Sequence, residues 1–389
     1  MGLFFKNKKK DKIVAIFDIG SSSIGGAKVF IPHDTENEVP VILDSVRLEM
    51  KSIASSNIND LEKEACFTLK KTAEALFSKK IGKLDEVICT MTTPWISSET
   101  KRVSVSKQSK FIVSKKFLGE LVDKELSKIT QDLKEKFETE REVIEKLIAE
   151  VSIDDEPTDN PINEECQFLD LYLSYSHTNK NFVTKSKEAL ESVFHSTPVS
   201  FSSFSILTYL MIRDSYVNQR ESYLILDIAG ETTDLSVVNR GIFGEKYSFP
   251  SGKKTLLKHL ALDLKIEERD ALELFRLYYQ NNLSLNHREK LKKYFESLER
   301  FWSEEFKHYL DTILKYHQLP KFIFLTIDVD MRNWFFEVFK KTELANNLTL
   351  DKRFQIIILD QTEMIDKCSL EVGNHDPFIM IEAIALSKK

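Results

Sequence analysis

Two distant segments of the chain repeat the same order of residue types. In the first segment, an apolar run at residues 14–17 is followed by Asp18-Ile19-Gly20-Ser21-Ser22-Ser23 and a second apolar stretch. In the other, the apolar residues 223–226 are followed by Asp227-Ile228-Ala229-Gly230-Glu231-Thr232-Thr233-Asp234. Each pattern predicts a β-hairpin with a polar turn. Two such turns facing each other would grip one ligand from both sides.

The residue types in these turns suit a phosphate group accompanied by Mg²⁺. Glycine lets the backbone approach an anion closely, and successive turn N–H groups and hydroxyls can donate to phosphate oxygens. The carboxylates of Asp18 and Asp227 can hold Mg²⁺ directly or through water. A single turn of this kind is most simply an ordinary hairpin, whereas the pair indicates a nucleotide site.

With both turns considered, the chain resembles the actin, Hsp70 and sugar-kinase ATPase superfamily, whose two halves each contribute a phosphate hairpin of this type. It is most similar to the family of the cell-division protein FtsA and the type IV pilus assembly protein PilM, since residues 227–234 are close to that family's Asp-Ile-Gly-Gly-Gly-Thr-Thr-Asp. The resemblance implies an actin-like α/β fold of two duplicated halves with an inserted SHS2-type domain, and ATP with Mg²⁺ as cofactors. The cofactor-binding residues that it implies are Asp18, Gly20, Ser21, Ser22, Ser23, Lys28, Asp227, Gly230, Glu231, Thr232, Thr233, Gly252 and Lys253, with Asp18 and Asp227 near the metal.

The order of predicted elements divides the chain in agreement with this resemblance. Three strands, a helix and a strand are predicted in the first half, and three strands followed by outer helices in the second. The Lys- and Glu-rich residues 115–150 are predicted to form an exposed helical face. The predicted parts are a basic tail at 1–12, a first half at 13–91 and 195–220, an inserted domain at 92–194, and a second half at 221–389 whose outer helical subdomain covers 253–319.

The sequence departs from the family at places that matter for ATP. Where relatives carry an acid at the start of the connecting helix, this chain has Phe201, which can neither orient water nor hold Mg²⁺. After the strand at 323–326, Ile327-Asp328-Val329-Asp330 replaces the glycines against which adenine and ribose lie in relatives. Lys253 and Lys254 would meet phosphate if the family geometry holds, and are otherwise solvated. These changes predict weak ATP binding or none, and at most slow hydrolysis.

Composition narrows the class of protein. The 389 residues, 42% of them hydrophobic, suffice for roughly two or three domains. A net charge of −6 provides no basic field for nucleic acid, and the four widely spaced cysteines favour free thiols in a reducing cytosol over a disulfide framework or zinc site. No apolar run is long enough to span a bilayer. We therefore expect a cytoplasmic protein peripheral to the inner membrane, with at most weak lipid contact through residues 3–12.

Together these features favour an FtsA-like scaffold that recruits or aligns a cell-division machine through its inserted domain, and that forms homopolymers. Asn160-Pro161 in the predicted insert supports this interpretation. A PilM-like pilus assembly protein is the alternative, supported by the Met1-Gly2-Leu3-Phe4 start and by the end of the chain at Lys389 without an amphipathic helix. A second alternative is a sugar or acetate kinase, which needs a substrate base in the cleft and an intact adenosine loop.

Overall fold

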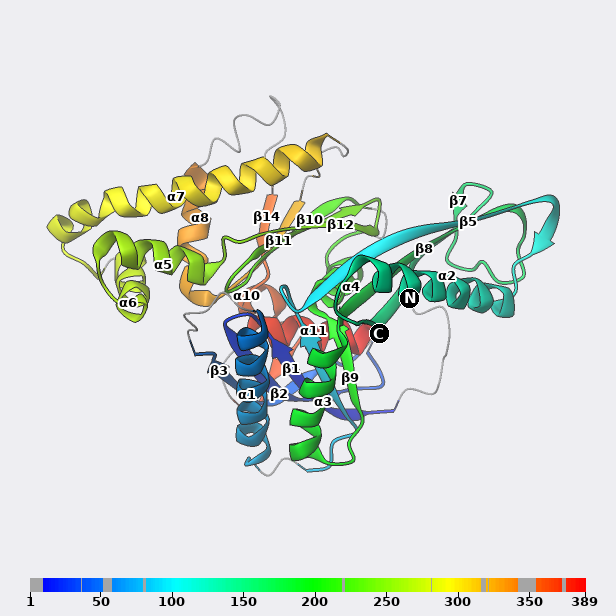
Figure 1. Cartoon of the computed structure of the whole chain (residues 1–389), viewed down its shortest axis with the longest axis horizontal. Coiled ribbons are helices and arrows are strands. Elements are labelled where there is room, and N and C mark those ends of the chain that lie inside the picture. The colour runs from blue at the N-terminus through cyan, green and yellow to red at the C-terminus, as the bar shows by residue number, and fades with distance from the viewer. Residues whose placement is uncertain are drawn as a thin grey trace.

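A computed structural model of the chain describes residues 10–35, 37–51, 58–79, 82–218, 221–280, 282–315, 320, 322–341, 355–372 and 376–389. Two central sheets lie one above the other, with a helical group at one side and a long β-rich arm at the other (Figure 1). The predicted contact of Leu3, Phe4 and Phe5 with lipid falls outside the described residues. Among those that are described, no helix combines the length and apolar character that a membrane crossing requires.

The first sheet has six strands in the order β15-β3-β2-β1-β4-β9. Strands β1, β2 and β3 form an antiparallel meander, and β4 and β9 continue the sheet in parallel. Helices α1 and α3 cover one face, where Phe17, Leu69 and Phe182 share a buried core. The elements are β1 (Lys12–Ile19), β2 (Ser23–Ile31), β3 (Val41–Glu49), α1 (Ile58–Phe77), β4 (Glu86–Met91), α3 (Lys180–Phe194), β9 (Val199–Ser203) and β15 (Ser369–Leu370).

The second sheet repeats the arrangement of the first. Its order is β12-β11-β10-β13-β14, again with an antiparallel meander followed by parallel strands. The register is repeated too, because Asp18 pairs with Thr90 across β1 and β4, and Asp227 pairs with Thr326 across β10 and β13. The predicted duplication of two α/β halves is confirmed. The strands are β10 (Tyr223–Ile228), β11 (Thr233–Asn239), β12 (Ile242–Phe249), β13 (Phe322–Ile327) and β14 (Gln355–Ile358).

Helices α4 (Phe204–Ser215) and α11 (Pro377–Lys388) pack against each other and join the two halves. Both are apolar almost all round, which is the pattern of a fully buried helix. Their side chains share one core with Ile16 of the first sheet and Ile225 of the second. Asp376 caps α11 by accepting hydrogen bonds from the backbone N–H groups of its first turn.

The helical group covers the outer face of the second sheet. Trp302, Trp334 and Phe335 are buried there, whereas Phe336 is 48% exposed. The helices are α5 (Lys253–Leu264), α6 (Glu268–Tyr279) and α7 (Leu285–Leu314), followed by η1 (Val329–Met331) and α8 (Arg332–Lys341). The short helix α10 (Gln361–Met364) lies apart from this group and contacts α11.

The arm is a four-stranded sheet in the order β5-β8-β6-β7, with α2 (Lys115–Lys136) packed against it. The prediction of a helical face across residues 115–150 is wrong beyond α2, because residues 141–150 belong to strand β6 (Arg141–Ile153). Its register against β8 shifts twice, and these bulges break the two-residue alternation by which a strand is recognised. The domain boundaries and the SHS2-type assignment stay predictions. The other strands are β5 (Ile96–Ile112), β7 (Glu156–Pro157) and β8 (Glu165–Asn179).

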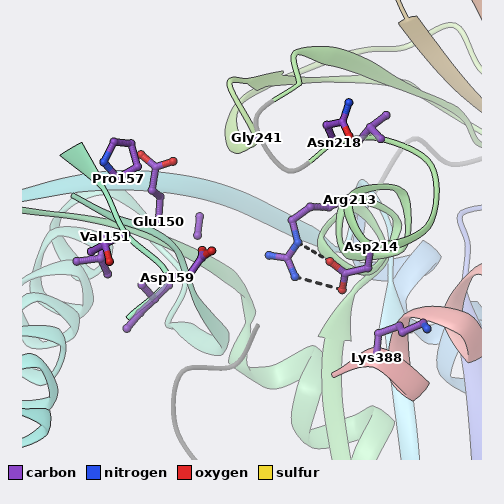
Figure 2. Close-up of a pocket in the computed structure, with 13 residues that line it drawn as sticks. Glu150, Val151, Pro157, Asp159, Arg213, Asp214, Asn218, Gly241 and Lys388 are labelled. Atoms are coloured by element: carbon purple, nitrogen blue, oxygen red, sulfur yellow. Dashed lines mark hydrogen bonds and ion pairs between the residues drawn. The ribbon is translucent and has the colours of Figure 1, made fainter. Parts of the chain in front are cut away.

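A groove of about 550 Å³ lies where this arm meets the first half (Figure 2). Residues 148–151 of β6 and 157–159 form one wall. The end of α4, with Arg213 and Asp214 in a two-bond ion pair, forms the other together with Lys388 of α11. The groove thus has residues of strand β6 on one wall and side chains of both charge signs along its lining.

Candidate functional site

The two predicted turns meet between the two halves, at the place that we call the cleft. We call residues 18–23 the first turn and residues 227–233 the second turn. The backbone N–H of Glu231 donates to the Ser21 hydroxyl at 3.0 Å. A Cβ atom built on Gly230 would lie 2.4 Å from the Cβ of Ser22, so glycine is required for this close approach. The turns therefore face each other, and they are in direct contact.

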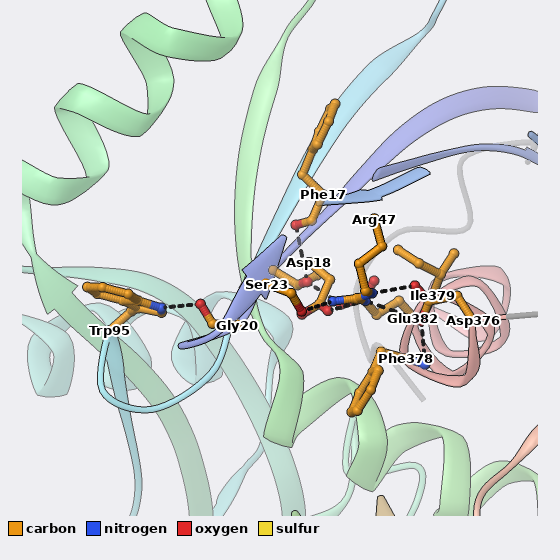
Figure 3. Close-up of polar contacts among 11 residues, drawn as sticks. Phe17, Asp18, Gly20, Ser23, Arg47, Trp95, Asp376, Phe378, Ile379 and Glu382 are labelled. Atoms are coloured by element: carbon orange, nitrogen blue, oxygen red, sulfur yellow. Dashed lines mark hydrogen bonds and ion pairs between the residues drawn. The ribbon is translucent and has the colours of Figure 1, made fainter. Parts of the chain in front are cut away.

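Arg47, which the sequence analysis did not single out, binds the carboxylate of the first turn (Figure 3). Its Nη2 donates to Asp18 Oδ2 at 2.6 Å, and its Nη1 donates to the Ser23 hydroxyl at 3.0 Å. The same guanidinium forms a two-bond fork with Asp376, with Nε 2.7 Å from Oδ2 and Nη2 3.2 Å from Oδ1. One cation thus links the first turn to the cap of α11.

Glycine at position 25 makes this arrangement possible. Asp18, Gly25 and Arg47 are neighbours in register across β1, β2 and β3. A Cβ atom at Gly25 would lie 2.5 Å from Arg47 Nη2, so any larger residue would displace the guanidinium. Arg47 crosses the middle strand to Asp18 because that strand has no side chain there.

Carboxyl groups are concentrated behind the first turn. Asp18 is 2% exposed and Glu382 of α11 is fully buried. Burial raises the pKa of Asp18, and the charge of Arg47 opposes that rise. Burial likewise raises the pKa of Glu382, although the Thr90 hydroxyl donates to its Oε1. Among the described residues, Asp18 Oδ1 and Glu382 Oε2 have no hydrogen-bond partner.

The equivalent acid of the second half has a different partner. Thr326 Oγ1 donates to Asp227 Oδ1 at 2.6 Å, so Asp227 has a hydroxyl neighbour instead of an ion pair with arginine. Burial, reinforced by the charge of Asp234, raises the pKa of Asp227 to about 7. Near neutral pH this carboxyl therefore carries a proton for a large part of the time.

Lys246 of β12 links the two halves with a buried charge. Its Nζ lies 2.8 Å from Asp234 Oδ2, and both side chains are less than a tenth exposed. The same ammonium donates to the Thr93 hydroxyl at 2.9 Å and to the Ser205 hydroxyl of α4 at 3.2 Å. Both hydroxyls belong to the other side of the cleft, so Lys246 holds the second sheet to α4.

The start of α5 lies directly on the second turn. The backbone N–H groups of Lys253 and Lys254 donate to the carbonyls of Ala229 and Gly230 at 2.9 and 2.7 Å. The Lys253 ammonium lies 2.9 Å from Asp328 and 3.2 Å from Asp330, the acids that replace the expected glycines. The two acids thus bind Lys253, one of the two lysines that would meet phosphate in the family geometry.

The remaining predicted residues are distributed unevenly around the cleft. Thr233 Oγ1 donates to the Ser251 carbonyl at 2.8 Å, whereas the Thr232 hydroxyl has no partner within the described part of the chain. Gly252 packs against the second turn, because a Cβ atom built on it would lie 2.6 Å from the Ala229 carbonyl oxygen.

Two further residues singled out from the sequence lie away from the turns. Lys28 lies farther along β2, where the charge acting on it is that of Glu371. Phe201 is half-buried in β9 against the core of the first half. Nucleotide binding by any of these residues stays a prediction.

No sequence motif identified the compensating groups Arg47, Asp376 and Lys246 as residues of the site. For Arg47 the detectable signal is a charged residue between the apolar Val46 and Leu48 of a strand, since a charge that becomes buried normally requires a partner.

The fold and the paired turns define a protein with the actin-like ATPase fold, and this predicted fold class is confirmed. Among solved structures, the PilM-PilN type IV pilus biogenesis complex matches with a TM-score of 0.61 and 12% identity, covering 96% of each chain. A Bacteroides thetaiotaomicron protein with actin-like ATPase fold and unknown function matches with a TM-score of 0.44 and 11% identity, covering 98% of this chain and 99% of that one. The ethanolamine utilization protein EutJ from Carboxydothermus hydrogenoformans gives 0.42 and 12%, with 97% and 90% covered. No family model and no curated protein matches the sequence.

Asp227→Asn should change how stability depends on pH. The pKa of Asp227 in the folded protein, about 7, lies above its ordinary value, so its contribution to stability is lost progressively as the pH rises from about 4 to about 7. Asparagine cannot ionise. We expect the unfolding temperature of the variant to rise relative to that of the wild type over this pH range, and the difference to level off at higher pH. The charged groups facing Asp227 are Asp18, Asp234 and Lys246.

Thermal unfolding over this pH range measures the difference, and Asp263→Asn on the exposed side of α5 is the matched control. The control should follow the wild type at every pH. Parallel curves for the wild type and Asp227→Asn would show that Asp227 is already ionised throughout the range.

Lys246→Met should destabilise the protein strongly. The substitution leaves Asp234 buried without its cation, which typically costs about 3–5 kcal/mol of unfolding free energy. Lys258→Met is the control, because Lys258 is 39% exposed and lies 3.8 Å from Glu231. That exposed pair should contribute less than about 1 kcal/mol. Urea unfolding compares the two variants, and equal losses would contradict the linking role of Lys246.

Proposed function

We propose that the chain is a scaffold of the PilM and FtsA type, and that the pilus assembly role of PilM is the better of the two interpretations. The observation that carries this proposal is the likeness to the PilM-PilN complex, which extends over 96% of both chains and therefore includes the arm as well as the two halves. Sequence features alone favoured an FtsA-like division role, which stays the alternative.

The proposed partner is a cytoplasmic segment of a membrane-anchored envelope protein that binds in the groove of Figure 2. The groove offers the polar walls and both charge signs that suit an extended polar peptide. It also lies at the arm, which the sequence analysis assigned to partner binding. Through this partner the chain would work at the cytoplasmic face of the inner membrane.

The kinase alternative has less support. A phosphotransferase needs an open site for the nucleotide, and the loop that would border the adenosine instead holds Lys253 through Asp328 and Asp330. A substrate panel that produced clear phosphotransfer would restore this alternative.

Val217→Arg should release the protein from membranes. Val217 lines the groove, and a long cation there would obstruct a bound peptide. Leu262→Arg is the control, because Leu262 is 76% exposed on α5, far from the groove. In native cells we expect the wild type and the control to co-fractionate with the inner membrane, and Val217→Arg to move to the soluble fraction. Equal membrane association of all three would contradict the groove as the partner site.

A photo-crosslinking residue at position 149 of the groove identifies the partner in the same cells. An adduct with a membrane-anchored pilus assembly protein supports the PilM-like role, and one with a division protein supports the FtsA-like alternative. A crosslinker at position 262 should give neither adduct.

A further inference from the structure

The fold implies ATP with Mg²⁺ between the two turns, and the residues present can be tested against that ligand. A phosphate chain gripped from both sides would have to pass between the first and second turns. The Gly230 backbone instead approaches Ser22 so closely that even a Cβ atom would not fit. The Glu231 N–H, a donor that phosphate would need, is already bonded to Ser21. The two turns are in direct contact, so no space for a phosphate chain remains between them.

The other donors that could bind phosphate are also used within the chain. The first N–H groups of a helix are a natural anion site, but those of Lys253 and Lys254 in α5 are bonded to carbonyls of the second turn. The side chain of Lys253 is held by Asp328 and Asp330. A nucleotide would have to break each of these contacts.

The metal position is also taken. Of the two predicted Mg²⁺ ligands, Asp18 is paired with Arg47 at 2.6 Å and Asp227 accepts a hydrogen bond from Thr326. In the described part of the chain, no group of three or more His, Cys, Asp and Glu side chains is arranged to hold a metal ion. The residues present therefore do not fit ATP with Mg²⁺.

We propose that the chain holds its cleft closed without nucleotide, and that the Arg47 guanidinium is the built-in cation that neutralises Asp18 and Asp376. Asp18, Ser21, Ser22 and Gly230 then act as packing and positioning residues of a closed scaffold. This inference does not depend on the partner or on the choice between the pilus and division roles.

Three features of Arg47 support its role as a permanent part of the cleft. Its guanidinium makes four hydrogen bonds, to Asp18, Ser23 and twice to Asp376. Its side chain is 22% exposed, and its Cζ atom lies 5.3 Å from the centroid of the Phe378 ring. Gly25 provides the space that it occupies. An arginine held on every side in this way is not positioned to move aside for a metal ion.

The direct test is ligand binding by the full-length wild-type protein. We expect titration calorimetry with Mg·ATP to give no binding heat, and millimolar Mg·ATP to leave the unfolding temperature unchanged within about 1 °C. A ligand present well above its Kd would raise that temperature by several degrees. Micromolar binding, or such a rise, would overturn the proposal.

Two substitutions test Arg47 itself. Arg47→Gln removes the charge, whereas Gly25→Ala keeps the charge and displaces the guanidinium. Both should lower the unfolding temperature by several degrees at about pH 8, because buried carboxylates lose their cation. Gly119→Ala is the control, because a Cβ atom at that exposed helical position meets nothing within 4 Å. It should leave the unfolding temperature unchanged or slightly higher.

The pH dependence separates charge compensation from simple packing. Without Arg47, the pKa of Asp18 loses the charge that lowers it, so the protonated carboxyl becomes the stable buried form and stability falls as the pH rises. We expect the deficit of Arg47→Gln to be clearly larger at about pH 8 than at about pH 5. A fall in unfolding temperature that is equal at both pH values would overturn the role of Arg47 as the cation. If Arg47→Gln does not fold, Gly25→Ala is measured in the same way. The groups facing Asp18 are Arg47, Cys89, Asp227, Asp328, Asp376 and Glu382.

Discussion

Burial of a carboxyl group at the end of each central strand is the constraint on which the cleft depends. Asp18 and Asp227 occupy equivalent positions of β1 and β10, and both are almost inaccessible to solvent. A charged carboxylate in such surroundings costs several kcal/mol unless a partner compensates it. The two halves meet this cost differently. Asp18 has an arginine, whereas Asp227 has a threonine hydroxyl and a pKa raised to about 7. The two halves thus share the acid and differ in its chemical surroundings.

The partners of these acids also join the parts of the molecule. Arg47 connects the first turn to Asp376, which caps α11, and Lys246 connects the second sheet to Ser205 in α4. Because α4 and α11 form the apolar core shared by both sheets, the charged contacts and the hydrophobic contacts hold the same two helices. Neither kind of contact alone would fix the closed cleft, since apolar packing is not directional and exposed ion pairs are weak.

The sequence was sufficient to predict the two hairpins, because turn residues and apolar periodicity are local signals, and the resemblance implied the α/β fold of two halves. Strand β6 was missed because its bulges disturb that periodicity. The site was only partly predictable. The turn residues were identified, but the contact of Arg47 with Asp18 requires the register of three strands, and its contact with Asp376 joins residues 329 positions apart. Such pairings are decided by tertiary structure, as is the binding of Lys253 by Asp328 and Asp330.

The closed cleft and the proposed partner groove are connected through the two shared helices. Helix α11 runs from its cap Asp376, held by Arg47, to Lys388 in the groove, and it is a single buried helix of 12 residues. Helix α4 likewise begins beside Lys246, which contacts Ser205, and ends with Arg213 and Asp214 in the groove. The contacts that hold the N-termini of both helices therefore also hold one wall of the groove in place. A wall that is already ordered reduces the entropy lost when a peptide binds. A cleft closed by its own residues would therefore suit a scaffold that binds its partner without first binding a nucleotide.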